Sequence, residues 1–105
     1  MDAENKQISG WRSMGEARET VGIVNAKGLH ARASAKFVNM VAMLPEGLDV
    51  KVVKDGAEAG GGSILGLMML GAARGDSVEI IVKGEEADVA LSKLAGLVKD
   101  GFGED

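Results

Sequence analysis

The sequence contains no cysteine and no tyrosine, and it has only two phenylalanines, one tryptophan and one proline among 105 residues. Without cysteine, the chain cannot form disulfides, thiol nucleophiles or cysteine-based zinc sites. With aromatic residues at 3%, it also has few platforms on which single-stranded nucleic acids could stack. We therefore expect an aliphatic core and no binding of nucleic acids. We also expect no cofactor, and no metal site, because the single histidine has no second histidine or cysteine beside which to bind a metal.

Charge and hydropathy narrow the class of protein further. Acidic residues outnumber basic ones by 16 to 12, which argues against the basic face that nucleic-acid binding requires. No apolar run approaches the roughly 20 residues of a membrane span. The first ten residues also lack the apolar segment of a signal peptide. We expect a cytoplasmic protein that does not contact membranes, with a single domain and a monomeric state as the default.

Hydrophobic periodicity predicts the element order βαββαβα. Strands are expected over residues 19–24, 48–54, 57–61 and 77–83, and helices over residues 31–44, 64–70 and 85–99. Each alternating strand has one apolar face, so the fold class is α+β, an open-faced two-layer sandwich. The same order also fits a ferredoxin-like domain with an added helix. Residues 1–17 lack periodicity and are expected to form a flexible tail before a domain over residues 18–105.

The chain has one histidine, His30, between a glycine-containing loop and the start of a helix. The first turn of a helix has backbone N–H groups without intrahelical partners, and these carry partial positive charge. Arg32 adds donors suited to phosphate oxygens, and Gly28 would let the backbone bend closely around a bound group. This arrangement favours an anion site, although a surface histidine near a helix cap would have the same sequence.

Ser63 follows three consecutive glycines, at positions 60–62, and marks the expected start of a second helix. Taken alone, Ser63 is an ordinary N-cap. The helix after it is too continuously apolar to bury every side chain, so some side chains must be exposed. We expect Ile64, Leu65 and Met68 to form a small apolar docking surface beside His30, with Ala35 across the gap.

Two segments resemble the HPr family of histidine phosphocarriers of the phosphoenolpyruvate-dependent phosphotransferase system. Residues 28–32 (GLHAR) resemble its phosphorylation site, and residues 63–71 (SILGLMMLG) resemble its regulatory-serine segment. The resemblance covers about residues 18–101. It implies a four-stranded antiparallel sheet with three helices on one face. Ala33 stands where the family usually has proline. Residues 30–34 (HARAS) are similar to the nitrogen-related variant of the family in α-proteobacteria, and this similarity implies a role in regulation rather than in sugar uptake.

The resemblance also implies a function and partners. His30 would accept a phosphoryl group at Nδ1 from enzyme I, with Arg32 assisting, and pass it to an enzyme IIA-type protein. Ser63 would be a target of the HPr kinase/phosphorylase. The protein would thus be a covalent carrier rather than an enzyme. Two alternatives remain open, a regulatory binding module controlled through Ser63 and a ferredoxin-like RNA-binding module, which the acidic charge disfavours.

Overall fold

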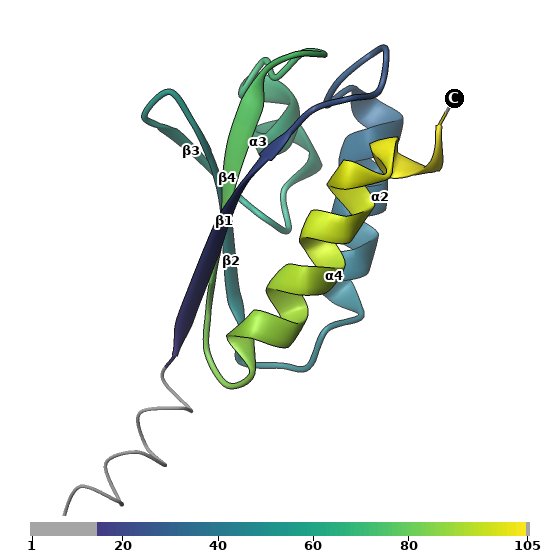
Figure 1. Cartoon of the computed structure of the whole chain (residues 1–105). Helices are drawn as coiled ribbons and strands as arrows, with labels where there is room; N and C mark the ends of the chain where they lie inside the picture. The colour runs from purple at the N-terminus through teal and green to yellow at the C-terminus, as the bar shows by residue number, and fades with distance from the viewer. Residues whose placement is uncertain (1–14, 105) are drawn as a thin grey trace, which may run out of the picture.

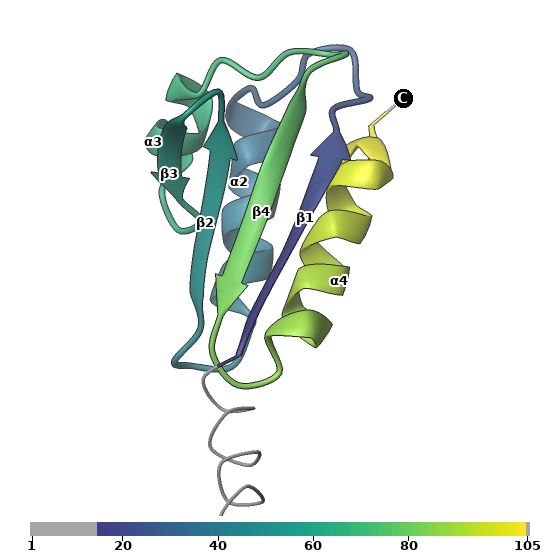
Figure 2. The same ribbon diagram turned by 60° about the vertical axis from the view of Figure 1, so that its left-hand side comes forward.

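The computed structural model describes residues 15–104, so most of the expected tail, residues 1–14, lies outside the described residues. Four antiparallel strands form one sheet: β1 (Glu16–Gly22), β2 (Asp49–Lys54), β3 (Ala57–Gly60) and β4 (Ser77–Lys83). Their order is β1-β4-β2-β3, which places β4 between β1 and β2 (Figure 2). At the β2–β3 hairpin, Asp55 and Gly56 both have positive φ, as a two-residue type I′ turn requires.

The helices cover one face of this sheet (Figure 1). They are α2 (Ala31–Ala42), α3 (Ile64–Met69) and α4 (Ala87–Lys99), followed by a 3₁₀ turn, η1 (Gly101–Gly103). The other face carries charged side chains, such as Arg18 paired with Glu16 and Glu79. The expected open-faced α+β sandwich is therefore confirmed. Within residues 15–104, no helix has both the length and the apolar character needed to cross a membrane.

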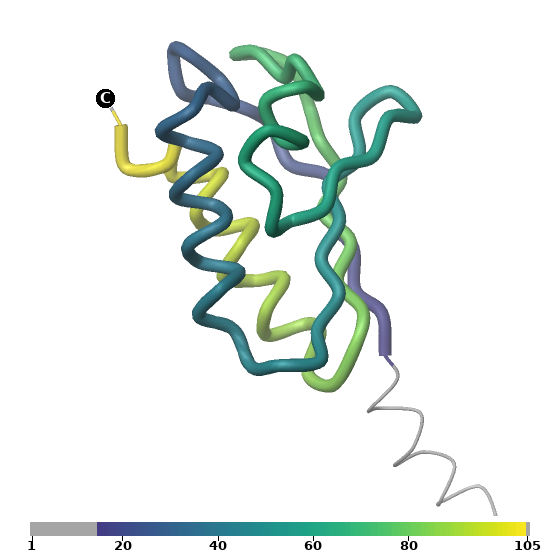
Figure 3. The backbone as a smooth tube through the Cα atoms, turned by 180° about the vertical axis from the view of Figure 1, so that it is seen from behind, coloured from purple at the N-terminus to yellow at the C-terminus, as the bar shows by residue number. Residues whose placement is uncertain are grey.

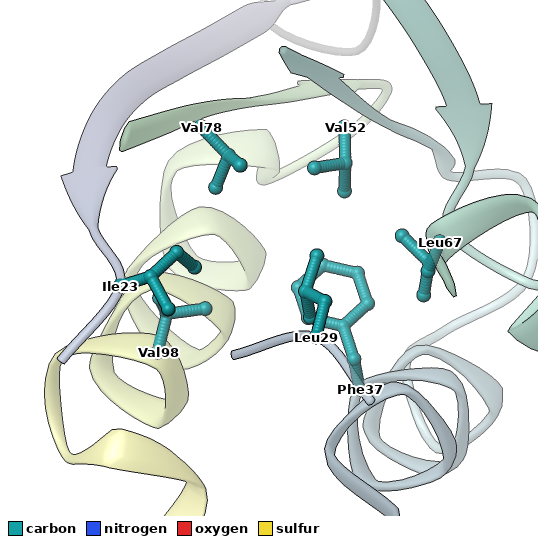
Figure 4. Close-up of a pocket in the computed structure, with 7 residues that line it drawn as sticks. All are labelled: Ile23, Leu29, Phe37, Val52, Leu67, Val78 and Val98. Atoms are coloured by element: carbon teal, nitrogen blue, oxygen red, sulfur yellow. The ribbon is translucent and has the colours of Figure 1, made fainter. Parts of the chain in front are cut away.

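Alternating strand residues and one side of each helix make up the core. Val52, Ile80 and Val82 project from the sheet toward Phe37 of α2 and Leu94 of α4, and all five are almost fully buried. A small gap at the centre has space for roughly one water-sized sphere and only apolar walls, so we expect it to be dry (Figure 4). Its walls are Ile23, Leu29, Phe37, Val52, Leu67, Val78 and Val98.

Several element boundaries differ from those expected. Strand β1 begins at Glu16, three residues before the expected start, because it pairs along the whole of β4, from Glu16 opposite Lys83. Helix α4 begins at Ala87 instead of residue 85, because Glu86 adopts a left-handed conformation with φ of 59°. The turn η1 was not expected at all, since its buried Phe102 also has positive φ, which non-glycine residues seldom adopt.

Candidate functional site

His30 is the N-cap of α2, at the helix start where the sequence placed it. Its backbone is extended, and its Nδ1 accepts a hydrogen bond from the Arg32 N–H at 3.3 Å. An acceptor nitrogen must carry a lone pair, so this geometry assigns the ring proton to Nε2. The side chain is 25% exposed. Nδ1 thus faces the unpaired amides of the first turn while the ring stays accessible from outside.

The loop that carries His30 is fixed by the segment after α3. The Leu29 N–H donates to the Ala72 carbonyl at 3.0 Å, and both loops lie at the same end of the molecule (Figure 3). Gly28 has φ of +63°, and a Cβ there would lie only 2.3 Å from the Ala72 oxygen. The glycine is therefore required by contact with this neighbouring loop, whereas the sequence suggested that it curves around a bound group.

The second ring nitrogen of His30 contacts a residue that the sequence analysis missed. Nε2 lies 3.0 Å and 3.2 Å from the two carboxylate oxygens of Glu104, which follows η1. The amide of Asn25 donates to Glu104 Oε1 at 3.1 Å and to the Gly28 carbonyl at 2.9 Å. Lys36 of α2 donates to the Phe102 carbonyl at 2.7 Å. Segment 101–104 is thus held against the start of α2.

These contacts favour the ionised form of Glu104. The hydrogen bond from His30 is the main cause that lowers the pKa of this carboxyl below its ordinary value. The Asn25 amide and the charges of His30 and Lys36 act in the same direction, whereas partial burial opposes them. The carboxylate is therefore ionised at neutral pH, beside the one histidine of the chain.

Arg32 contributes to the site in two ways. Its backbone N–H donates a hydrogen bond to Nδ1 of His30, and its side chain is exposed. Among residues 15–104, the guanidinium has no salt-bridge partner. In the same part of the chain, no three His, Asp or Glu side chains lie close enough together to hold a metal ion.

Ser63 is the N-cap of α3, and its Oγ accepts the Gly66 N–H at 2.9 Å. In the helix that follows, Leu67 is fully buried while Ile64, Leu65 and Met68 are exposed. Leu65 is the most exposed of these three, at 67%. Helix α3 packs beside α2, on which Ala35 is half-buried. Within the described residues, four further large apolar side chains are exposed that were not among those expected: Val24, Met43, Met69 and Val89.

A partly exposed histidine at the start of a helix, on a small open-faced sandwich, is an arrangement suited to proteins that carry a group on one side chain. Comparisons with known proteins agree. The family described as "PTS HPr component phosphorylation site" matches residues 17–100. The phosphocarrier protein HPr of Neisseria meningitidis serogroup A is 38% identical over 87 residues, covering 83% of this chain and 96% of that protein.

A related carrier and a solved structure give the same result. The phosphocarrier protein NPr of Escherichia coli K12 is 33% identical over 91 residues, covering 84% of this chain and 97% of that protein. A crystal structure of HPr from Thermoanaerobacter tengcongensis aligns with a TM-score of 0.78 and 32% identity, covering 85% and 98% of the two chains. The chain belongs to the HPr family of phosphocarrier proteins. The strand order β1-β4-β2-β3 had already settled the topology, which the element order alone leaves open.

Proposed function

We propose that His30 accepts a phosphoryl group from phospho-enzyme I and passes it to an enzyme IIA-type protein in the cytoplasm. The observation that carries this proposal is the orientation of the ring. Nδ1 has its lone pair directed at the start of α2, whereas Nε2 is occupied by Glu104. A phosphoryl group on Nδ1 would therefore lie among backbone N–H donors at the positive end of the helix.

Arg32 is proposed to stabilise the phosphoryl group during transfer. A guanidinium offers a planar fork of donors that matches phosphate oxygens. Because its side chain is exposed, it can follow the group as the partner's nitrogen approaches in line. The protein is a carrier between enzymes, since the chemistry of phosphoenolpyruvate cleavage belongs to enzyme I.

Partner docking is proposed at the apolar surface beside the site, formed by Ala35, Ile64, Leu65 and Met68. Exposed aliphatic and methionine side chains suit a surface that must dock to more than one partner, because methionine adapts its shape. We propose that a monomer presents this surface.

Ser63 is proposed as a regulatory phosphorylation site for an HPr kinase/phosphorylase. A phosphate on Oγ would replace the neutral cap of α3 with a charged one, which a helix start tolerates. It would also place negative charge at the edge of the docking surface and so weaken the binding of partners. A regulatory pathway of the nitrogen type is supported by the resemblance of residues 30–34 (HARAS) to the nitrogen-related variant of the family.

The test is to mix the purified protein with enzyme I and phosphoenolpyruvate and to measure its intact mass. We expect one added phosphoryl group that is lost in acid and is absent in His30→Ala. A Ser63→Ala variant should be phosphorylated as the wild type is. If an active cognate enzyme I adds no phosphate to the wild type, the carrier proposal is wrong, and regulatory binding through Ser63 becomes the leading alternative.

A further inference from the structure

The segment that carries Glu104 is held in place by contacts with the rest of the fold. Phe102 is buried in the core, and its carbonyl is bound by Lys36. The Asn25 amide is itself fixed, because exchanging its oxygen and nitrogen would place an acceptor against two other acceptors, the Gly28 carbonyl and Glu104. The carboxylate is only 17% exposed. It therefore reaches Nε2 in a held position.

We infer that Glu104 is a positioning residue for phosphoryl transfer, keeping a proton on Nε2 of His30 while Nδ1 gains and loses the phosphoryl group. This inference rests on the proposed function and adds a residue to it. Its logic is that of a carboxylate which orients an imidazole and stabilises the positive charge that develops on the ring. Here the carboxylate acts through Nε2, on the side of the ring away from the phosphorus.

The two transfer steps show why the proton matters. On acceptance, the lone pair of Nδ1 bonds to phosphorus, and the donor nitrogen leaves with the electron pair of its own bond to phosphorus. The phosphorylated ring of His30 then carries a positive charge, with its proton on Nε2 directed at Glu104. On donation, the bond between phosphorus and Nδ1 breaks and its electron pair returns to Nδ1. Because Nε2 still holds its proton, the leaving ring is neutral imidazole instead of an imidazolate anion.

The charges around the ring support this assignment. Glu104 is the negative group, on segment 101–104, and Lys36 and Arg32 are the positive groups on α2. Lys36 binds a carbonyl of the same segment as Glu104 and helps to keep that carboxyl ionised. Both cations are repelled by a charged ring, so Glu104 is the group that offsets the positive charge of the phosphorylated state.

The first test is independent of any partner protein. Because His30 is the one histidine in the chain, its ring nitrogens are resolved directly in a ¹⁵N NMR spectrum of the intact protein. At a pH where the ring is neutral, we expect the wild type to show Nε2 protonated and Nδ1 unprotonated. In Glu104→Ala, the signals should move toward the average of two tautomers. A wild-type ring with its proton on Nδ1 would overturn the inference.

The second test separates charge from shape. Glu104→Gln keeps the size of the side chain and removes its charge, whereas Glu104→Asp keeps the charge on a shorter side chain. We expect Glu104→Gln to slow transfer from phospho-enzyme I by at least about tenfold and Glu104→Asp to recover part of that loss. Glu46→Gln is the matched control, since this exposed glutamate lies beyond the far end of α2, and it should transfer at the wild-type rate.

A third measurement uses phosphorylated protein prepared with phosphoramidate, a small chemical donor. Hydrolysis of phosphohistidine is faster when the ring is protonated, so the midpoint of its pH profile reports how firmly Nε2 holds its proton. We expect Glu104→Gln to shift this midpoint to lower pH, because the negatively charged partner of the protonated ring is lost.

The outcomes separate this inference from the proposed function. If enzyme I fails to phosphorylate the wild type, the carrier proposal fails while the tautomer and hydrolysis measurements still decide the role of Glu104. If Glu104→Gln transfers at the wild-type rate, or faster than Glu104→Asp, the carboxylate only fills space and the inference is wrong. An unchanged hydrolysis profile would overturn the inference in the same way.

Discussion

The starts of α2 and α3 use the same local device and differ in what surrounds it. At each start, the N-cap side chain accepts a backbone N–H, His30 Nδ1 at 3.3 Å and Ser63 Oγ at 2.9 Å. The Ser63 contact spans three positions, whereas His30 also contacts Glu104, 74 positions later in the chain. In both cases the capping atom is the atom proposed to carry phosphate. The two starts therefore share a local capping hydrogen bond, and only the start of α2 adds a contact with a distant carboxylate.

The largest effect is expected from Gly28→Ala, because the loop before α2 touches a distant segment. Its added Cβ would lie 2.3 Å from the Ala72 carbonyl oxygen, at a backbone φ of +63°. We expect the free energy of unfolding to fall by about 3 kcal/mol or more, since both strain and a backbone clash are introduced. Urea denaturation with a fluorescent or circular-dichroism signal would measure it.

Gly71→Ala is the matched control for that variant. Gly71 follows α3 with φ of +67°, but no atom lies within 4 Å of its added Cβ. Only the conformational strain remains, so we expect a loss of about 1 kcal/mol. Equal losses in the two variants would mean that the loop of His30 is no more constrained than the end of α3, and the comparison would fail.

Arg32→Gln tests whether phosphoryl transfer at His30, the start of α2, requires the charged side chain of Arg32 in addition to the capping hydrogen bond. The backbone N–H that caps His30 remains in this variant, and the exposed side chain has no salt-bridge partner within residues 15–104. We therefore expect an unchanged urea midpoint and a phosphoryl-transfer rate lowered by about 10- to 100-fold. Lys93→Gln, which removes an exposed charge on α4, should leave both unchanged. A loss of stability without a loss of rate would assign Arg32 a structural role.

Ser63→Ala shows how much the N-cap of α3 contributes to the free energy of unfolding. Loss of the bond from the Gly66 N–H should lower the free energy of unfolding by about 1 kcal/mol. Ser63→Asp should recover most of this stability, because aspartate is also a good N-cap, while its negative charge weakens docking to enzyme I. Stability is read from urea denaturation and docking from titration calorimetry. If Ser63→Asp binds enzyme I as tightly as the wild type, charge at this position does not regulate docking.

The sequence predicted the features whose causes are local. Alternating apolar residues in the strands gave the sheet, and the positions of His30 and Ser63 as N-caps followed from helix starts that can be read within a few residues. The partners of His30 could not be found in this way. The contact of Asn25 with Glu104 spans 79 positions, and that of Lys36 with Phe102 spans 66. The turn that brings Glu104 to His30 requires a positive φ at Phe102, a conformation that phenylalanine seldom adopts. Burial of the Phe102 side chain in the core explains this conformation, and such burial cannot be read from the local sequence.

The smallest effect is expected from pH, and of the two helix starts it should act only on that of α2. The pKa of Glu104 is lowered in the folded protein, chiefly by the hydrogen bond from His30. The stability that this carboxylate contributes is therefore complete above its unfolded value, near 4.5, and is lost as the pH falls through the lower folded value. The urea midpoint of the wild type should accordingly fall further between about pH 6 and pH 3 than that of Glu104→Gln.

Ser63, at the start of α3, provides the control for this pH dependence. Serine does not titrate in this range, so Ser63→Ala should lose stability in acid in parallel with the wild type. The lowered pKa of Glu16, held by Arg18, contributes equally to all three proteins and cancels from the comparison. If Glu104→Gln follows the wild-type curve as closely as Ser63→Ala does, the contact between Glu104 and His30 contributes nothing to stability. The two helix starts would then be equivalent in the free protein, and any difference between them would have to arise when partners bind.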